Sequence, residues 1–387
     1  MIPLSATLRV VEPYLPGALV PQRARAWMFG LADRLPAVLS RCLYFETRLA
    51  DRGGPADLSL AVENDGAEIL AGANRRIALP AEFLTNPVWQ RIRFFCRQWL
   101  VGSVPLRKAV GRIWLEFDTP LRKPRGGDPP PAPGIFIEWR RAAFGGASPE
   151  ARFQLAAKAL AALLDGEALR AAAPLVRSAM TALPAGAYPP YLGVMLQRAG
   201  GGIRLCVERF DGRPLLAFLR AIGWPGAHDV LAQLMVDLAR VRRGAAFVGP
   251  GVTAVDLVSQ AAPRVGLEYV FARRPQFRGQ LHEERFLDLL VLRGWCDADC
   301  RRQLARWPGC TTHVLAHDLW PSVLHRRLNH VKLSVGDDAR IEAKAYLALM
   351  CFPKLRAARR APLIDPELYR IEDQRQSHPA SYSPAAS

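Results

Sequence analysis

Residues 191–209, YLGVMLQRAGGGIRLCVER, predict the fold more clearly than any other part of the chain. Two apolar-rich runs, Tyr191–Arg198 and Ile203–Arg209, flank the turn Ala199–Gly202 and indicate a β-hairpin. The second run alternates apolar with polar residues: Leu205 and Val207 against Arg204, Cys206 and Glu208. A period of two predicts strands with one apolar and one polar face.

The same unit, a strand pair followed by a helical segment, recurs in both directions from this hairpin. The predicted strand pairs are 44–48 with 57–63, 112–118 with 135–140, 191–198 with 203–209, 254–260 with 265–271, and 330–335 with 342–350. The helical segments are expected at about 87–101, 149–164, 167–182, 213–223, 226–243, 283–294 and 297–306. The chain therefore consists of five similar repeats.

Ten strands joined as serial hairpins are expected to pair with their neighbours. An open sheet of that size is near the practical limit and has two exposed edges. We therefore predict an α+β fold, a closed ten-stranded antiparallel β-barrel of five helix–strand–strand repeats inside an outer ring of helices. The alternative is an open sheet with helices on one face, an α+β sandwich. We expect residues 39–355 to form one barrel domain, between an N-terminal helical extension at 1–38 and a basic, disordered tail at 356–387.

In a barrel the apolar strand faces would pack against the helices, and the polar faces would line the lumen. The acidic lumenal residues would be Glu46, Asp57, Glu116, Asp118, Glu138, Glu208, Asp256, Glu268 and Glu342. The basic ones would be Arg48, Arg112, Arg140, Arg204, Lys332 and Lys344. Some of these residues must form ion pairs, because unpaired buried charges are too costly.

The composition limits the class of protein. The chain has 387 residues, 50% of them hydrophobic, with 52 Lys and Arg against 35 Asp and Glu, a formal net charge of +17. The apolar fraction excludes a disordered chain, and no uncharged apolar run reaches the roughly 18 residues that span a bilayer. We find no signal-peptide pattern and expect a cytoplasmic, bacterial protein, a monomer that binds no membrane. The basic excess attracts polyanions, but no nucleic-acid-binding signature accompanies it, so we expect no nucleic-acid partner.

The seven cysteines are an odd number in a long chain and are expected to be free thiols. Cys296, Cys300 and Cys310, followed by His313 and His317, first suggest a zinc site. Their spacing fits no standard zinc motif, and the first two fall on or beside a helix whose apolar face can bury them. We predict no metal site.

Five helix–strand–strand repeats over residues 40–352 resemble the ABBA (PT-barrel) prenyltransferases, which modify indoles, phenols and peptides. Those enzymes hold the isoprenoid diphosphate with inward Lys and Arg residues, many in Lys-x-Tyr pairs, and shield the allylic cation with tyrosine. This chain has one such pair, Lys344-Ala345-Tyr346, with Lys332 on the adjacent predicted strand. The fungal enzymes repeat the pair on several strands, and the lumen predicted here is richer in acid.

The resemblance implies that Arg204, Lys332, Lys344 and Tyr346 bind diphosphate. Tyr346, with Trp114, would shield the cation. It also implies a carboxylate general base, for which Glu46 and Glu116 are the candidates by position. An allylic diphosphate would be the co-substrate, and Mg²⁺ is allowed but not required.

Three functions remain open. The first is prenyl transfer to an aromatic or peptide side-chain acceptor, in the setting of ribosomal peptide natural-product biosynthesis. The second is a different reaction on a peptide through lumenal acid–base groups, with His330 and Glu342 as candidates. The third is a non-catalytic peptide-binding barrel, and the basic exterior would suit an acidic leader peptide.

Overall fold

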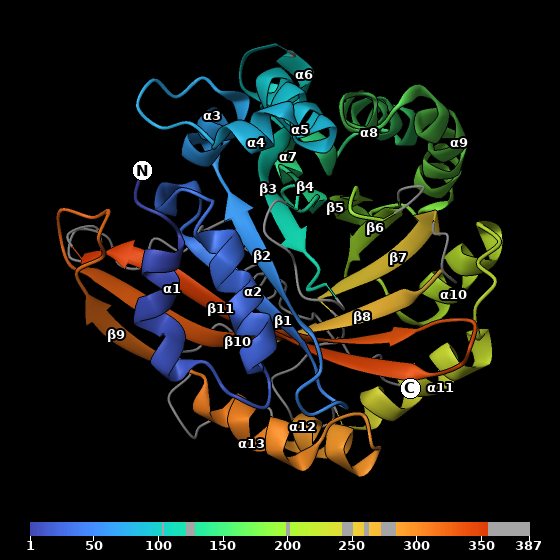
Figure 1. Ribbon diagram of the computed structural model, residues 1–387. Coiled ribbons are helices and arrows are strands. Elements are labelled where there is room, and N and C mark those ends of the chain that lie inside the picture. Colours follow the sequence, from blue (N-terminus) through green and yellow to red (C-terminus); the bar gives the residue numbers. More distant parts are fainter. Residues whose placement is uncertain are drawn as a thin grey trace, which may run out of the picture.

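A computed structural model describes residues 1–102, 104–120, 128–198, 202–241, 251–258, 263–271 and 284–354. These residues form an 11-stranded sheet in the order β11-β1-β2-β3-β4-β5-β6-β7-β8-β10-β9, and β11 also pairs with β10 (Figure 1). That last pairing closes ten strands into an antiparallel barrel, with β9 attached to one end of β10. The predicted closed barrel is confirmed, and the open sandwich is excluded.

The strands follow the predicted order. Their bounds are β1 Cys42–Arg48, β2 Ala56–Val62, β3 Val110–Phe117, β4 Gly134–Trp139, β5 Tyr188–Met195, β6 Ile203–Glu208, β7 Val252–Val258, β8 Val265–Val270, β9 Gly309–His313, β10 Ser322–Val335 and β11 Ile341–Pro353.

The helices of the described residues lie before the first hairpin and between successive hairpins. The α-helices are α1 Ser5–Val11, α2 Gln22–Ala32, α3 Asn64–Ala71, α4 Ala81–Thr85, α5 Pro87–Arg97, α6 Val104–Ala109, α7 Arg141–Phe144, α8 Pro149–Leu163, α9 Gly166–Ala182, α10 Gly212–Ala221, α11 His228–Val241, α12 Glu284–Leu292 and α13 Ala298–Arg306. Short 3₁₀ turns occupy Glu12–Tyr14 and Ala37–Leu39, and Gln98–Gly102 form a π-helical turn. No described helix is long and apolar enough to cross a bilayer.

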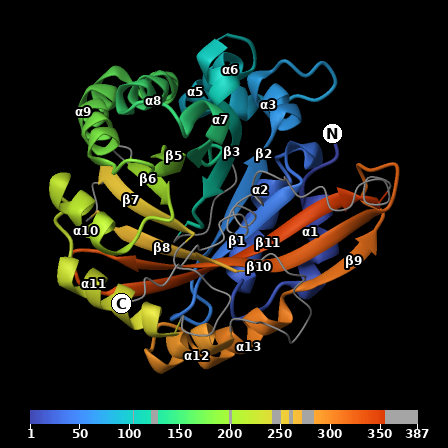
Figure 2. The same cartoon turned by 180° about the vertical axis from the view of Figure 1, so that it is seen from behind.

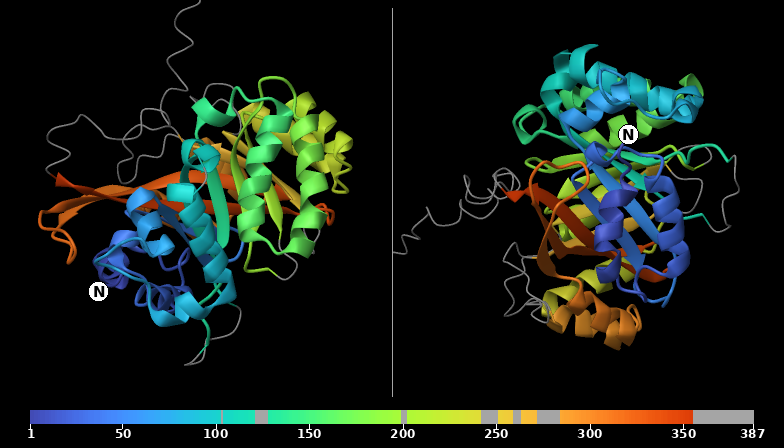
Figure 3. Two further views of the ribbon diagram at one scale, coloured as in Figure 1. Left: turned by 90° about the horizontal axis from the view of Figure 1, so that it is seen from above. Right: turned by 60° about the vertical axis from the view of Figure 1, so that its left-hand side comes forward.

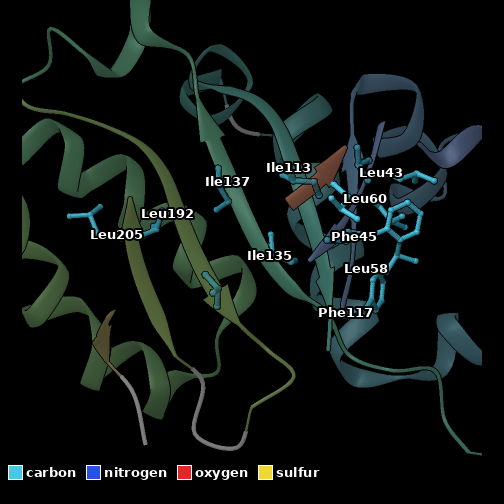
Figure 4. Close-up of a cluster of buried hydrophobic side chains, with 14 of the residues drawn as sticks. Leu43, Phe45, Leu58, Leu60, Ile113, Phe117, Ile135, Ile137, Leu192 and Leu205 are labelled. Carbon is cyan, nitrogen blue, oxygen red and sulfur yellow. The ribbon is translucent and has the colours of Figure 1, made fainter. Parts of the chain in front are cut away.

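The helices surround the barrel (Figures 1 and 2). The apolar residues of the strands are buried. On β1–β6 these residues form a buried layer, shown in Figure 4: Leu43, Phe45, Leu58, Leu60, Ile113, Phe117, Ile135, Ile137, Leu192 and Leu205. Burial of this layer between strands and helices leaves the other strand faces for the lumen, as the alternation predicted.

The N-terminal segment lies outside the barrel and does not fill it. Helices α1 and α2 lie on the outside of the barrel (Figure 1), and α2 contacts β2. The Thr47 hydroxyl on the outer face of β1 donates to the Leu19 carbonyl at 2.6 Å. The Arg25 guanidinium donates to the carbonyls of Val20 and Leu15, both at 2.7 Å, and fixes the loop before α2. The segment is therefore a clasp on the outer face.

Strands β10 and β11 are longer than predicted, and they extend past the rest of the barrel together with β9 (Figure 3). A β-bulge lies between Leu328 and His330, so that Asn329 is an extra residue against β11. Before the bulge Arg327 is opposite Ala348, and after it His330 is opposite Tyr346. The bulge therefore switches the inward positions of β10 from odd to even residue numbers.

Two further observations concern the predicted boundaries. Arg140, predicted to be lumenal, lies beyond the end of β4 and is exposed at the start of α7, so that prediction is wrong. The tail at 356–387 and most of the turn at 199–202 lie outside the described residues. The domain boundaries proposed above remain predictions.

Candidate active site

The lumen contains a set of ion pairs between inward-facing residues of neighbouring strands. The pairs are Lys344–Glu46 (2.7 Å), Lys332–Glu268 (3.3 Å), Arg204–Asp256 (2.7 Å), Arg112–Glu138 (3.0 Å) and Arg48–Glu342 (3.1 Å). Each predicted lumenal cation on these strands has a carboxylate partner, as the cost of an unpaired buried charge requires.

Two lysines meet in the lumen next to a tyrosine. Lys332 on β10 and Lys344 on β11 are directly opposite in the strand register. Tyr346 is on the same face of β11 and is directly opposite Glu46 of β1 in the strand register. Three of the four predicted diphosphate-binding residues are thus neighbours. The fourth, Arg204, lies on β6, with β7 and β8 between it and β10.

Aromatic rings adjoin the two lysines. His330 stacks on Tyr346 with ring centroids 3.9 Å apart. The Tyr44 ring on β1 is in a T-shaped arrangement with the His330 ring, with centroids 6.3 Å apart. Its centroid lies 4.6 Å from that of the Trp114 ring. Trp114 also donates from its indole nitrogen to Glu138 at 3.3 Å. Tyr346 and Trp114, the two predicted shielding residues, therefore belong to one cluster, joined through Tyr44 and His330.

His330 is a neutral residue of this cluster. Burial lowers its pKa to about 4, despite the opposing effect of Glu268. Its Nδ1 lies 2.9 Å from the Asn329 amide nitrogen, and donation from that amide leaves the ring proton on Nε2. Nε2 is buried and has no hydrogen-bond partner among the residues that the structure describes, and the nearest Glu268 oxygen is 3.9 Å away. A bound ligand with an acceptor atom would satisfy it.

The suggested His330–Glu342 couple is not formed. His330 is opposite Tyr346, whereas Glu342 is opposite Ser334, four residues further along β10. Glu342 instead pairs with Arg48 and, at 2.7 Å, with Arg264. This correction follows from the strand register, which places the two residues about 13 Å apart along the strand.

The two carboxylates predicted as general bases differ sharply. Burial would raise the pKa of Glu46, but the charge of Lys344 and hydrogen bonds from Lys344 and Tyr346 hold that pKa well below its ordinary value. Burial raises the pKa of Glu116 to about 8, with further contributions from the charges of Glu46 and Asp118. At neutral pH Glu46 is an ionised partner of Lys344, and most Glu116 carboxyls carry a proton.

Asp57 on β2 is a second buried acid with an elevated pKa. Burial and the neighbouring Glu46 raise the pKa of Asp57 to about 7. Its carboxylate accepts a hydrogen bond from the Thr119 amide at 2.7 Å and lies 3.6 Å from Arg48. Acid–base groups near neutrality are typical of functional sites.

Tyr44, Tyr191 and Glu268 also face the lumen, and of these three only Glu268 was predicted to do so. Tyr44 precedes Glu46 by two residues and therefore lies on the same face of β1. Tyr191 is opposite Glu138, and Glu268 is opposite Lys332. These juxtapositions depend on strand register, for which the sequence has no direct signal.

No group of three or more His, Cys, Asp or Glu side chains within the described ranges is arranged to hold a metal ion. Cys296 and Cys300 are buried around the start of α13, whereas Cys310 is exposed on β9. The zinc arrangement considered for these residues gains no support from their positions.

Comparison with solved structures gives the class of the fold. The prenyltransferase PriB, crystallised with L-tryptophan and dimethylallyl thiolodiphosphate, aligns with a TM-score of 0.50 and 14% identity over 89% of this chain and 94% of its own. Two others align at lower TM-scores: 5-dimethylallyltryptophan synthase from Streptomyces coelicolor (0.46, 15% identity, 89% and 97% coverage) and AnaPT from Neosartorya fischeri (0.45, 16%, 79% and 76%). No family model matches the sequence, and no curated protein matches it either. The chain has the barrel fold of the ABBA prenyltransferases, at an identity that establishes the fold alone.

Proposed function

We propose that the protein transfers an isoprenoid group from an allylic diphosphate to an aromatic or peptide side-chain acceptor. The observation on which the proposal rests is the pair Lys332 and Lys344, directly opposite each other in a closed lumen beside Tyr346 and the aromatic cluster. Fixed cations stabilise a departing diphosphate in a water-poor cavity, and aromatic faces stabilise an allylic cation. PriB, which has this fold, was crystallised with a dimethylallyl thiolodiphosphate and L-tryptophan, and this supports the choice of substrates.

In the proposed reaction the carbon–oxygen bond of the allylic diphosphate breaks, and its electron pair leaves with the diphosphate. The acceptor supplies the electron pair of the new bond to the allylic carbon and then releases a proton to a base. Glu116 suits this last role better than Glu46, because its pKa of about 8 makes it the stronger base once ionised. Tyr346 and Trp114 would shield the cation between the two steps.

The lumenal charges impose a condition on donor binding. Lys332 and Lys344 are already paired with Glu268 and Glu46, so this group of four has no net charge. A diphosphate must therefore compete with both carboxylates for the two lysines. The elevated pKa values of Glu116 and Asp57 reduce the negative charge of the lumen at neutral pH, which favours the anion.

The proposal is tested by incubating the protein with dimethylallyl, geranyl and farnesyl diphosphates and a panel of aromatic compounds and peptides. We expect prenylated product or slow hydrolysis of one donor, lost in Lys332→Met and in Lys344→Met. Lys354→Met, at the exposed end of β11, is the matched control and should keep full activity. Absence of both donor binding and donor turnover, with every donor, would refute the proposal.

A second candidate is acid–base chemistry on a peptide without a diphosphate. The elevated pKa values of Glu116 and Asp57 favour it, since groups that titrate near neutrality suit general acid–base catalysis. Turnover of a peptide that continues without donor, and that is lost in Glu116→Gln but kept in Lys344→Met, would select this candidate. A peptide that binds without any turnover would select the non-catalytic barrel.

A further inference from the structure

Glu116 is distinctive among the lumenal carboxyl groups. Within the described residues its side chain has no ion-pair or hydrogen-bond partner, although only 8% of the residue is exposed. By contrast, the acids Glu46, Glu138, Asp256 and Glu268 each have a cation within 3.3 Å. A buried carboxyl without a partner is costly, so an arrangement that retains one calls for an explanation.

The charged residues around Glu116 are paired with other residues, among them Glu46 with Lys344 and Asp118 with Arg198. The titratable groups that act on it or face it are Glu46 on β1, Asp118 beyond the end of its own strand, Arg204 on β6, Lys332 on β10 and Tyr346 on β11. Both cations are committed, Arg204 to Asp256 and Lys332 to Glu268. Its cross-strand neighbours, Ser59 on β2 and Gly134 on β4, are uncharged. Among the described residues, no cation is therefore free to pair with the ionised form of Glu116.

We propose that the lumen binds a cationic nitrogen group, an alkylammonium or a guanidinium of the acceptor, in an ion pair with Glu116. Such a group supplies a positive charge next to the ionised carboxylate and forms a charge-assisted hydrogen bond with it. Trp114, two residues away on the same face of β3, offers an aromatic face to the same cation. That the bound group belongs to the acceptor rests on the proposed function, but the binding of the cation does not.

The binding of a cation at this position has a proton signature. Burial and the neighbouring acids raise the pKa of Glu116 to about 8, so at pH 7 the cation must displace a proton from the carboxyl. Binding at pH 7 should release up to one proton, and affinity should rise between pH 6 and pH 8.5 as the carboxyl ionises. Asp57, with a pKa near 7, could contribute to the same release and therefore needs its own variant.

The test is isothermal titration calorimetry without any donor, in phosphate and in Tris buffer at pH 7. The probes are Nα-acetyl-arginine amide, Nα-acetyl-lysine amide and, as the neutral match, Nα-acetyl-citrulline amide. Agmatine has the guanidinium of arginine but no peptide groups, so its affinity shows whether the peptide groups are needed for binding. We expect one of the cationic probes to bind at least tenfold more tightly than the citrulline probe, with proton release seen as a buffer-dependent heat.

Variants assign the effect to Glu116. Glu116→Gln should abolish the proton release and weaken the cationic probe at least tenfold. Asp57→Asn should retain most of the preference over citrulline, and Glu68→Gln on the exposed face of α3 should change nothing. The wild-type proton release needs no variant, so the test stands even where a variant folds poorly.

The inference is overturned by equal affinity for the arginine and citrulline probes, by unchanged binding in Glu116→Gln, or by proton release on addition of inorganic diphosphate but not of any cation. Donor binding is measured separately. A protein that binds donor but no cation keeps the proposed function and loses this inference, and a protein that binds the cation but no donor does the reverse.

Discussion

Replacement of Glu116 by glutamine should stabilise the protein, and should do so increasingly as the pH rises. Glutamine has the shape of the protonated carboxyl but cannot ionise. The pKa of Glu116 is raised in the folded protein from 4.5 to about 8, mainly by burial and then by Glu46 and Asp118. Below pH 4.5 the carboxyl is protonated in both the folded and the unfolded chain, so its ionisation contributes nothing. Between pH 4.5 and pH 8 the unfolded chain loses the proton and the folded chain keeps it, so the free energy of unfolding falls.

The magnitude follows from about 1.36 kcal/mol per pKa unit. The cost of Glu116 to the folded state is about 1 kcal/mol at pH 5 and about 4 kcal/mol at pH 8. Glu116→Gln should therefore gain about 3 kcal/mol over wild type between these two pH values. Such a change is a large fraction of the stability of an ordinary domain.

The assay is urea unfolding at pH 5, 6.5 and 8, followed by the fluorescence of the nine tryptophans. Glu68→Gln, an exposed substitution of the same kind, is the control and should parallel wild type at every pH. Parallel pH profiles for wild type and Glu116→Gln would refute the reasoning, because they would mean that Glu116 titrates alike in the folded and the unfolded chain.

Three other substitutions test separate parts of the structure. Lys344→Met should cost about 3–5 kcal/mol of stability by leaving Glu46 buried and unpaired, and Lys344→Met with Glu46→Gln should recover most of that loss in urea unfolding. Gly266→Ala should weaken diphosphate binding in calorimetry while the far-ultraviolet circular dichroism spectrum stays unchanged, because the new methyl group would lie 2.3 Å from Cε of Lys332 and displace that side chain; unchanged affinity would argue against a binding role for Lys332. Phe45→Ala should destabilise the barrel by about 3–5 kcal/mol at every pH, since Phe45 is fully buried between β1 and the helices, and a loss below about 1 kcal/mol would contradict its place in the core.

The fold could be predicted from the sequence because it depends on a simple alternation. Each inner strand has apolar residues at every second position, and that period assigns the two faces before any contact is known. Strand β9, GCTTH, was missed because it has no apolar alternation, and its burial pattern shows no buried residue. The first half of β10 was missed because Arg326 and Arg327 are consecutive and the bulge at Asn329 interrupts the period.

The site could be predicted only as a list of inward residues. Alternation placed Glu46 and Glu116 on the lumenal face. It could not show that Lys344 neutralises Glu46, or that Glu116 has no ion-pair partner in the described part of the chain. Alternation also could not show that His330 is opposite Tyr346 and not opposite Glu342. A register shift by an even number of residues leaves the same side chains in the lumen, so the sequence pattern does not distinguish the two pairings. The chemistry of this lumen is set by which strand positions are opposite one another.

The bulge at Asn329 determines where strand β10 can lose a residue without reversing its two faces. Leu328 faces outward, opposite Leu347, and His330 faces inward, opposite Tyr346, so removal of Asn329 would leave both side chains on their present faces and restore a regular ladder. Removal of Leu333, by contrast, would bring Lys332 and Ser334 onto opposite faces and turn the rest of the strand inside out. Loss of one residue at the bulge therefore preserves the lumenal face of β10, whereas loss of one residue beyond the bulge reverses it. Related chains that differ by one residue at the bulge can keep the same lumen.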